Sequence, residues 1–99
     1  MTAPSQTLLL VVEDVFPMPH RGELWTTCVA RSGRPTPGQH IVVTRPDGGT
    51  RTTRVIAVEA CAPPRATPEW AGIVLPIEDD PFVIVGATIQ ERASVVPAS

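Results

Sequence analysis

The chain has 99 residues and a formal net charge of −2 at pH 7, and 42% of its residues are hydrophobic. This length suits one domain with an adequate core and is too short to hold a catalytic GTPase domain as well. The chain contains no lysine and no Gly-x-x-x-x-Gly-Lys segment, which excludes the P-loop class of nucleotide hydrolases.

Twelve prolines and seven glycines favour short strands joined by turns over long helices. We therefore predict an all-β fold, a six-stranded closed antiparallel β-barrel, because closure removes the edges that invite aggregation. The predicted strands are Leu8–Phe16, Glu23–Arg31, Gln39–Arg45, Thr50–Ala60, Trp70–Glu78 and Phe82–Gln90. We expect a single domain over residues 8–90, with flexible tails at residues 1–7 and 91–99.

The first strand leads into the segment Glu13–Gly22, on which the prediction of the fold depends most. Pro17 and Pro19 lack backbone N–H donors, so strand pairing should pause there. Gly22 permits the positive φ that a chain reversal needs. From these residues alone, the segment is a strand, a stiff corner and a returning strand.

The third predicted strand alternates between two faces, with Ile41 and Val43 on one face and His40, Val42 and Thr44 on the other. Pro46-Asp47-Gly48-Gly49 follows it and predicts a hairpin to Thr50–Ala60. An irregular connection is expected over Cys61–Glu69, and a tight turn at Asp79-Asp80-Pro81.

Two apolar runs, Leu8–Val12 and Val83–Val85, lack clean alternation and allow two interpretations. If nothing covers them, they form an apolar patch of the kind that marks a partner site. Alternatively, both lie in the barrel wall, with their outer faces under the loops.

Cys28 and Cys61 lie 33 positions apart, and neither belongs to a Cys-x-x-Cys pair. No basic segment precedes Leu8–Val12, and this run is too short for a signal-peptide core or a membrane span. We expect both cysteines to be buried, reduced residues in a cytoplasmic protein.

The sequence gives little evidence for a catalytic or metal-binding site. Glu13 and Asp14 are adjacent, so a strand directs their side chains to opposite faces, where they make a poor acid–base pair. His20 and His40 have no third metal ligand at tight spacing, which favours surface histidines. Glu78–Asp80 lacks the ligand count of a calcium site and favours a solvated turn. We expect no catalysis, no metal and no cofactor.

The charges are unevenly distributed along the chain. From Arg21 to Arg54 there are six arginines and two acids, whereas from Val55 onward there are two arginines and six acids. This pattern predicts that one outward basic face contacts RNA or an acidic partner. Its predicted members are Arg21, Arg45, Arg51 and Arg54. The competing interpretation is that Arg51 and Arg54 pair with acids such as Asp47 and Glu59, which implies no partner.

Glu13-Asp14-Val15-Phe16, followed three residues later by His20-Arg21-Gly22, resembles the opening of the second domain of elongation factor Tu and related translational GTPases. Pro37–Val43 is similar to the start of that family's third strand, and Trp70-Ala71-Gly72 is similar to its Arg-Ala-Gly segment. The resemblance extends over roughly Leu8 to Gln90 and implies the β-barrel of that domain.

The resemblance also implies a place beside a GTPase domain, aminoacyl-tRNA and small-subunit RNA. Glu13, Asp14 and Phe16 match the acidic pair and phenylalanine that line the family's aminoacyl pocket, and Arg21 and Gly22 match its Arg-Gly corner. We expect a non-catalytic binding module that contacts RNA, tRNA or the ribosome. The alternative is a protein-interaction module that keeps only the barrel scaffold. The expected partner is an unknown protein or RNA, with no nucleotide and no membrane, and the expected assembly is a monomer or small homo-oligomer.

Overall fold

A computed structural model describes residues 7–61 and 70–92, and in these ranges the regular elements are strands and two short 3-10 helices, with no α-helix. The predicted all-β class is confirmed. The strands are β1 Leu9–Met18, β2 Glu23–Ser32, β3 His40–Thr44, β4 Thr50–Arg54, β5 Ala57–Cys61, β6 Trp70–Pro76 and β7 Thr88–Glu91, and the 3-10 helices are η1 Pro19–Arg21 and η2 Ile77–Asp79. Residues 1–6, 62–69 and 93–99, which hold most of the two predicted tails and of the connection after Cys61, lie outside the described ranges.

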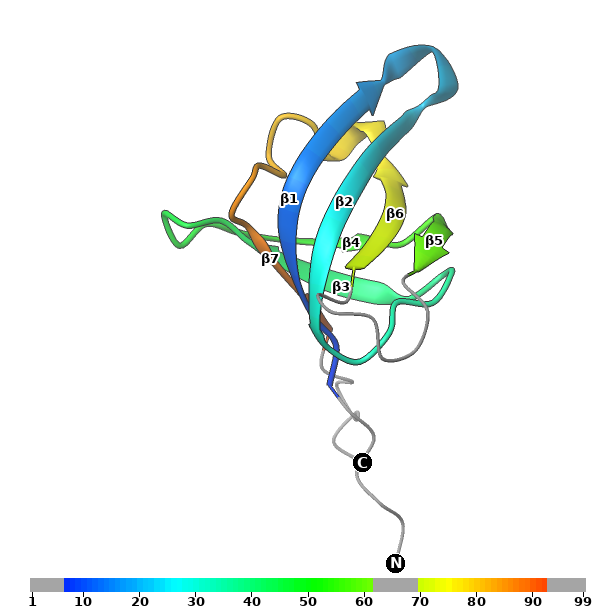
Figure 1. Ribbon diagram of the computed structural model, residues 1–99. Coiled ribbons are helices and arrows are strands. Elements are labelled where there is room, and N and C mark those ends of the chain that lie inside the picture. The colour runs from blue at the N-terminus through cyan, green and yellow to red at the C-terminus, as the bar shows by residue number, and fades with distance from the viewer. Residues whose placement is uncertain (1–6, 62–69, 93–99) are drawn as a thin grey trace, which may run out of the picture.

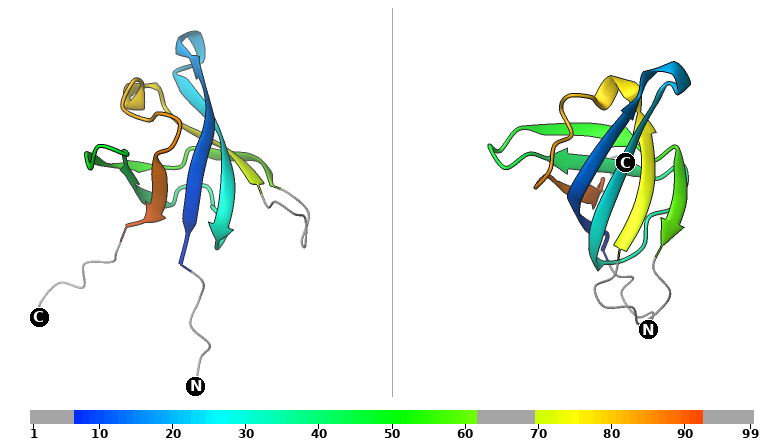
Figure 2. Two further views of the ribbon diagram at one scale, coloured as in Figure 1. Left: turned by 60° about the vertical axis from the view of Figure 1, so that its left-hand side comes forward. Right: turned by 45° about the horizontal axis from the view of Figure 1, so that its top comes forward.

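The strands form one antiparallel sheet in the order β4-β3-β7-β1-β2-β6-β5. The sheet folds over on itself, so that β1, β2 and β6 form a front layer and β3 and β4 cross behind it (Figure 1). Figure 2 shows the same two layers from the side, with β7 bridging from β3 to β1. The β1–β2 hairpin extends beyond the back layer, and we call its outer half, Glu13–Thr27, the arm.

The number of strands differs from the prediction because Thr50–Ala60 is two strands and not one. The Val55 amide donates to Gln39 O at 2.9 Å, whereas the next amide, Ile56, donates to Val74 O at 2.8 Å. The chain therefore changes from the neighbourhood of β3 to that of β6 within two residues. β4 and β5, which are the two edge strands of the sheet, are consecutive in sequence. No strand pairing joins β4 to β5, so the hydrogen bonds do not close the sheet into the predicted six-stranded barrel.

The core lies between the two layers and is filled by alternate residues of each strand. Ile41 and Val43 are fully buried and His40 is exposed, which confirms the alternation predicted for this strand. Full burial of an aliphatic side chain of this size stabilises the fold by about 1.5–3 kcal/mol. The largest buried side chains are Leu8, Leu10, Leu24, Ile41, Ile73, Leu75 and Ile89.

The two apolar runs prove to be different from each other. In the first run, Leu8, Leu10 and Val12 are buried, so every second residue belongs to the core. In the second run, Val83 is buried but Val85 is 59% exposed. The predicted strand Phe82–Gln90 is wrong over its first half, because only Thr88–Glu91 is extended. Residues 80–87 turn instead: Ala87 N donates to Ile84 O, and Gly86 has a φ of +92°.

The predicted pause at Pro17 does not occur. β1 pairs with β2 through Pro17, opposite Leu24, to Met18, opposite Glu23. Proline is compatible with a ladder only where its nitrogen faces away from the partner strand, as on an open edge. β7 pairs with β1 only over Leu9–Val11, so the far side of β1 is open at Pro17. The corner itself forms at η1 and ends at Gly22, whose φ of +68° confirms the predicted reversal.

The two cysteines cannot form a disulfide in this fold. Cys28 on β2 and Cys61 on β5 both pair with Ala71, from opposite sides of β6. Their backbones are therefore two strand spacings apart, roughly 9–10 Å, beyond the reach of a disulfide. Cys28 is fully buried, as predicted, and its thiol is free.

Gly22→Val should lower the free energy of unfolding by about 1–2 kcal/mol, because a branched residue is strained at positive φ. No atom lies within 4 Å of a Cβ placed at Gly22, so the cost is conformational rather than steric. Gly22→Asn should cost less, since asparagine tolerates this region. Urea melts that give all three proteins the same midpoint would contradict this account of the corner.

Cys28 should make stability depend on pH in the alkaline range. Burial raises the pKa of this thiol from 9.0 to about 11; the hydrogen bond with the Thr26 hydroxyl lowers the pKa by a smaller amount, and the charge of Glu13 raises it slightly. The unfolded chain then loses the proton first, so the free energy of unfolding should fall as pH rises from about 9 to about 11. The chain has no lysine or tyrosine to obscure this dependence. In a Cys61→Ala background, urea melts across this range should show the decline, and the further change Cys28→Ala should abolish it.

Candidate binding surfaces

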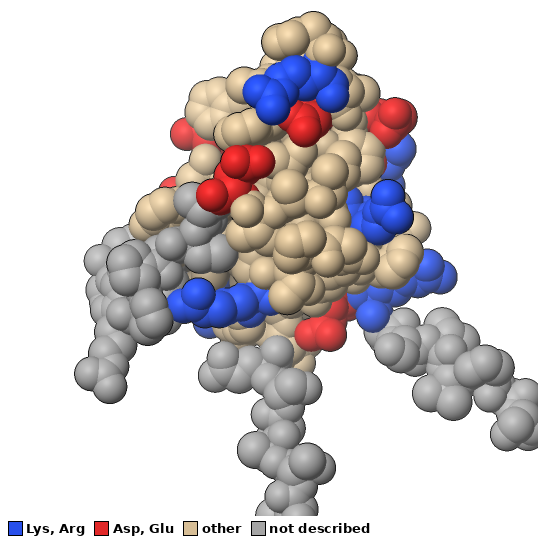
Figure 3. All heavy atoms as spheres, turned by 90° about the vertical axis from the view of Figure 1, so that its right-hand side faces the viewer, with Lys and Arg blue, Asp and Glu red and all other residues tan. Residues whose placement is uncertain are grey.

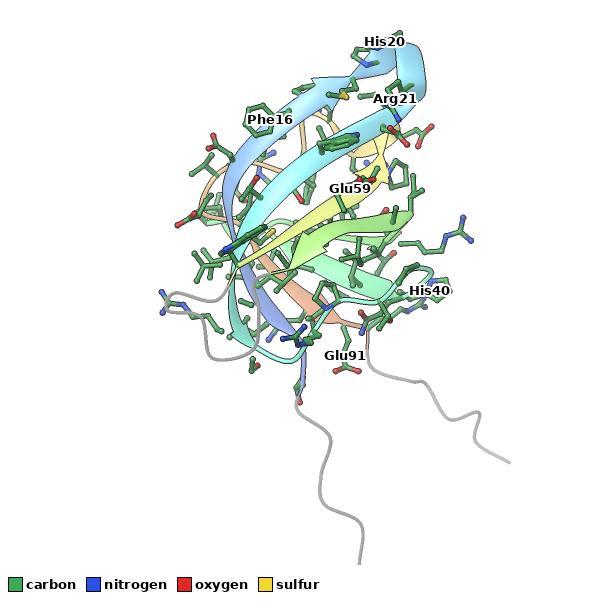
Figure 4. All side chains as sticks on the ribbon, turned by 45° about the vertical axis from the view of Figure 1, so that its right-hand side comes forward. Phe16, His20, Arg21, His40, Glu59 and Glu91 are labelled. Carbon is green, nitrogen blue, oxygen red and sulfur yellow. The ribbon has the colours of Figure 1, made fainter. Side chains whose placement is uncertain are left out.

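The arm carries the aromatic side chain with the greatest exposed fraction, Phe16 at 51% compared with 40% for Trp70 on β6. Phe16 on β1 lies directly opposite Trp25 on β2, so both side chains lie on the same face of the hairpin. The neighbouring residue Leu24 is fully buried, which makes the face of Phe16 and Trp25 the outer one. Phe16 is 51% exposed, and Figure 4 shows its ring pointing away from the sheet.

Arg21, at the tip of the arm, is held against Trp25 by Glu23. The Arg21 Nε lies 3.0 Å from Glu23 Oε1, and the same oxygen accepts a hydrogen bond of 3.1 Å from Trp25 Nε1. The Arg21 guanidinium lies 5.6 Å from the centroid of the Trp25 ring. Glu23 thus pairs with the charge of Arg21 and also holds the indole N–H of Trp25. The sequence did not predict this role of Trp25, because there it is simply one large residue within the predicted strand Glu23–Arg31.

The acidic pair lies on β1 beside Phe16. The register between β1 and β2 shifts between Val12 and Asp14, so Glu13 is an extra residue in the ladder. Both Glu13 and Asp14 are exposed, and within the described residues neither belongs to an ion pair. A bulge of this kind locally redirects side chains and twists the strand. The residues predicted from the resemblance, Glu13, Asp14, Phe16, Arg21 and Gly22, are thus all brought to one arm.

The predicted basic face does not form as one surface. Arg51 and Arg54 are three residues apart on β4, so their side chains lie on opposite faces of the sheet. Arg51 pairs across the ladder with Val43, whose side chain is buried, and Arg54 pairs with His40, whose side chain is exposed. Figure 3 shows basic and acidic side chains interspersed on the side of the molecule it displays. The reason is the strand alternation, which a count of charges along the chain ignores.

Arg45 also has an acidic neighbour. Its Nε lies 3.4 Å from Asp47 Oδ2 but makes no hydrogen bond, so the contact is an ion pair of poor geometry. The guanidinium lies 5.2 Å from the ring centroid of Phe82. Within the described residues, Arg54 belongs to no ion pair. The competing interpretation is right for Arg51, which pairs with an acid other than the two named, because Asp47 engages Arg45.

That acid is Asp79, the only buried acidic group in the described residues. Its side chain is 2% exposed, and its Oδ1 lies 2.8 Å from Arg51 Nε. Its Oδ2 accepts a 2.6 Å hydrogen bond from the Thr53 hydroxyl. Asp79 ends η2, so this contact fastens the connection between β6 and β7 to the edge strand β4. Arg51 therefore has a structural role.

The described residues contain no group of three or more histidine, cysteine or acidic side chains that could hold a metal ion. His20 lies at the tip of the arm and His40 at the opposite end of the molecule, so the two do not share a site (Figure 4). No helix in residues 7–61 and 70–92 is long and apolar enough to cross a membrane.

Arg51→Gln should lower the free energy of unfolding by about 1–3 kcal/mol, because the buried Asp79 carboxylate loses its cationic partner. The value lies below that of a fully buried pair, since the Arg51 side chain is 43% exposed. Arg54→Gln removes the same charge from the same strand on the opposite face, and should change stability by less than about 0.5 kcal/mol. Equal urea midpoints for the two variants would contradict the structural role of Arg51.

No protein-family model, no curated protein and no solved structure matches the chain. The resemblance to the second domain of elongation factor Tu stays a prediction drawn from the residues quoted above.

Proposed function

We propose that this chain is a non-catalytic binding module that docks a protein partner on the outer face of the arm. The observation that carries the proposal is the exposed Phe16, half of whose surface is in contact with solvent although it lies opposite Trp25 on a regular hairpin. A large aromatic side chain exposed in this way contributes little to the core, and can contribute much to an interface.

The residue types on the arm support a protein partner. Aromatic residues, methionine and arginine are enriched at the centres of protein interfaces, and the arm presents Phe16, Met18, Arg21 and Trp25 within one hairpin. Because Glu23 fixes both Arg21 and Trp25, these side chains lose little conformational entropy on binding. The exposed Glu13 and Asp14 border the aromatic pair and favour a partner with basic residues around an apolar anchor.

A second candidate function for the arm is the one implied by the resemblance: contact with tRNA or the ribosome. Glu13, Asp14 and Phe16 are all exposed on one strand, as residues lining a recognition pocket must be. Phe16 could stack on a base or an aminoacyl group. Two acids beside Phe16 and an arginine already paired with Glu23 weaken the attraction to phosphates, which is why we rank a protein partner first.

We further propose that the folded-over sheet acts as a closed barrel like that of elongation factor Tu domain 2. This is supported by the two-residue link between its edge strands, in which Val55 is hydrogen-bonded to Gln39 beside β3 and Ile56 is hydrogen-bonded to Val74 on β6. The module would act in the cytoplasm without cofactor or catalysis, as a monomer or a small homo-oligomer. The free Cys28 thiol is compatible with a reducing compartment.

The test compares the wild type with Phe16→Ser and with Val85→Ser, a matched control that is equally exposed but lies outside the arm. We expect wild type and Val85→Ser to capture the same protein from a lysate treated with ribonuclease. With the purified partner, Phe16→Ser should weaken binding about 5- to 30-fold, a hot-spot effect, while its thermal stability stays unchanged. Equal affinity of all three proteins would contradict docking on the arm. Capture that ribonuclease abolishes would favour the RNA candidate.

A further inference from the structure

Nine mainly polar residues lie on the outer face of β3, β4 and β7, and we call this surface the grid. None of them belongs to the arm. Since Ile41 and Val43 are buried, their neighbours on β3 point outward. Each of these neighbours has one partner on β4 and one on β7 or, for His40, at the residue directly after β7. The three rows across the sheet are Arg54–His40–Arg92, Thr52–Val42–Gln90 and Thr50–Thr44–Thr88.

The first row brings two arginines and a histidine together from three distant parts of the chain. Arg54 pairs with His40 in the β3–β4 ladder, and Arg92 N donates to His40 O at 2.9 Å, which continues the β3–β7 register by one residue. All three side chains are exposed. The three ion pairs of the described residues engage Arg21, Arg45 and Arg51, so none of them neutralises Arg54 or Arg92.

The row places one arginine on each side of His40. A phosphate bound over His40 would be attracted by both guanidinium groups. Only Arg54 of this row belonged to the basic face expected from the sequence. Arg92 was missed because it lies 38 positions further along, in an acidic part of the chain, and only the β3–β7 pairing brings it to His40.

The other two rows supply hydrogen-bonding groups and almost no apolar surface. Four of the six residues are threonines and one is glutamine, and these side chains can both donate and accept hydrogen bonds. Val42 is the only apolar member and is half-buried. The centre of a protein interface is apolar, so this face fits a protein partner poorly. It fits phosphate oxygens, which arginine, threonine and glutamine commonly contact.

We propose that this grid binds the phosphate backbone of single-stranded RNA, with Arg54, His40 and Arg92 contacting phosphates. The threonine and glutamine rows then face the sugars, where the 2′-hydroxyl is both donor and acceptor and distinguishes RNA from DNA. The grid is a second site, independent of docking on the arm. His40 lies at the end of the molecule opposite the arm tip (Figure 4), so both surfaces can be occupied together.

Binding should be weak, because the chain as a whole has a net charge of −2. It should also weaken as the salt concentration rises, because it depends on contacts with phosphates. Two phosphates neutralised by arginine predict a slope of log affinity against log salt of roughly −1.4 for single strands. Each arginine removed should lower the magnitude of this slope by about 0.7.

The experiment measures fluorescence anisotropy of a labelled oligouridylate of about 12 nucleotides, a length suited to one such domain, from about 50 to about 200 mM salt. Arg54→Gln and Arg92→Gln should each weaken binding about two- to fivefold at low salt and lower the slope as stated. Arg31→Gln, which removes the same charge from an exposed residue of β2, and Phe16→Ser on the arm should change neither quantity. Thermal melts check that each variant is folded.

Chemical-shift mapping of the wild-type protein gives a second readout that needs no variant. The amides of Val42, Thr52 and Gln90 should shift on adding the oligouridylate, whereas those of the arm should not.

An unchanged slope in the Arg54→Gln/Arg92→Gln double variant, or no binding at low salt, overturns the proposal. Equal affinity for the matching deoxyoligonucleotide overturns the assignment to RNA. Binding of polyglutamate with the same affinity and the same dependence on Arg54 and Arg92 would point instead to an acidic protein segment. Because Phe16→Ser is in the same series, failure of this site is distinguishable from failure of docking on the arm.

Discussion

The passage of the chain from β4 to β5 is the constraint on which the rest of the structure depends. Val55 is bonded to the segment before β3, and Ile56 is bonded to β6, so two adjacent residues hold the opposite ends of the sheet together. Val55 is fully buried at this crossing. A sheet held in this way must fold over, and its inner face becomes a core that needs no helix to cover it. The edges that remain are short strands of five residues each.

The buried Asp79 contributes a second fastening between the same regions. It joins η2 to the inner face of β4 through Arg51 and Thr53, and thereby holds the connection that brings β7 between β3 and β1. Without β7, β3 and β4 would lose the ladder that joins them to the rest of the sheet. The charge pattern of the sequence placed Arg51 on a binding surface. In the fold its charge is paired with the buried Asp79 carboxylate and is not available to a ligand.

The two outer surfaces of the molecule differ in chemistry, and this difference is the basis of the two proposals. The arm presents aromatic side chains bordered by acids, with its one arginine already paired. The grid of β3, β4 and β7 presents Arg54 and Arg92, which belong to no ion pair within residues 7–61 and 70–92, among threonines. An apolar anchor suits a protein, and a flat cationic and hydroxyl-rich face suits a phosphate backbone. A module with both could hold a protein and an RNA at once, which would suit an accessory factor without an active site.

The sequence by itself determined the all-β class, the hairpin at Pro46–Gly49, the reversal at Gly22 and the alternation of Ile41 and Val43, because these depend on local backbone preferences and on a period of two. It also identified the residues of the arm, since they are close together along the chain. The tertiary structure alone decided that Thr50–Ala60 breaks at Val55, since both halves are equally β-prone and only their different partners distinguish them. It alone separated Arg51 from Arg54 and joined Arg54 to Arg92, because strand pairing, and not distance along the chain, determines which charges are neighbours.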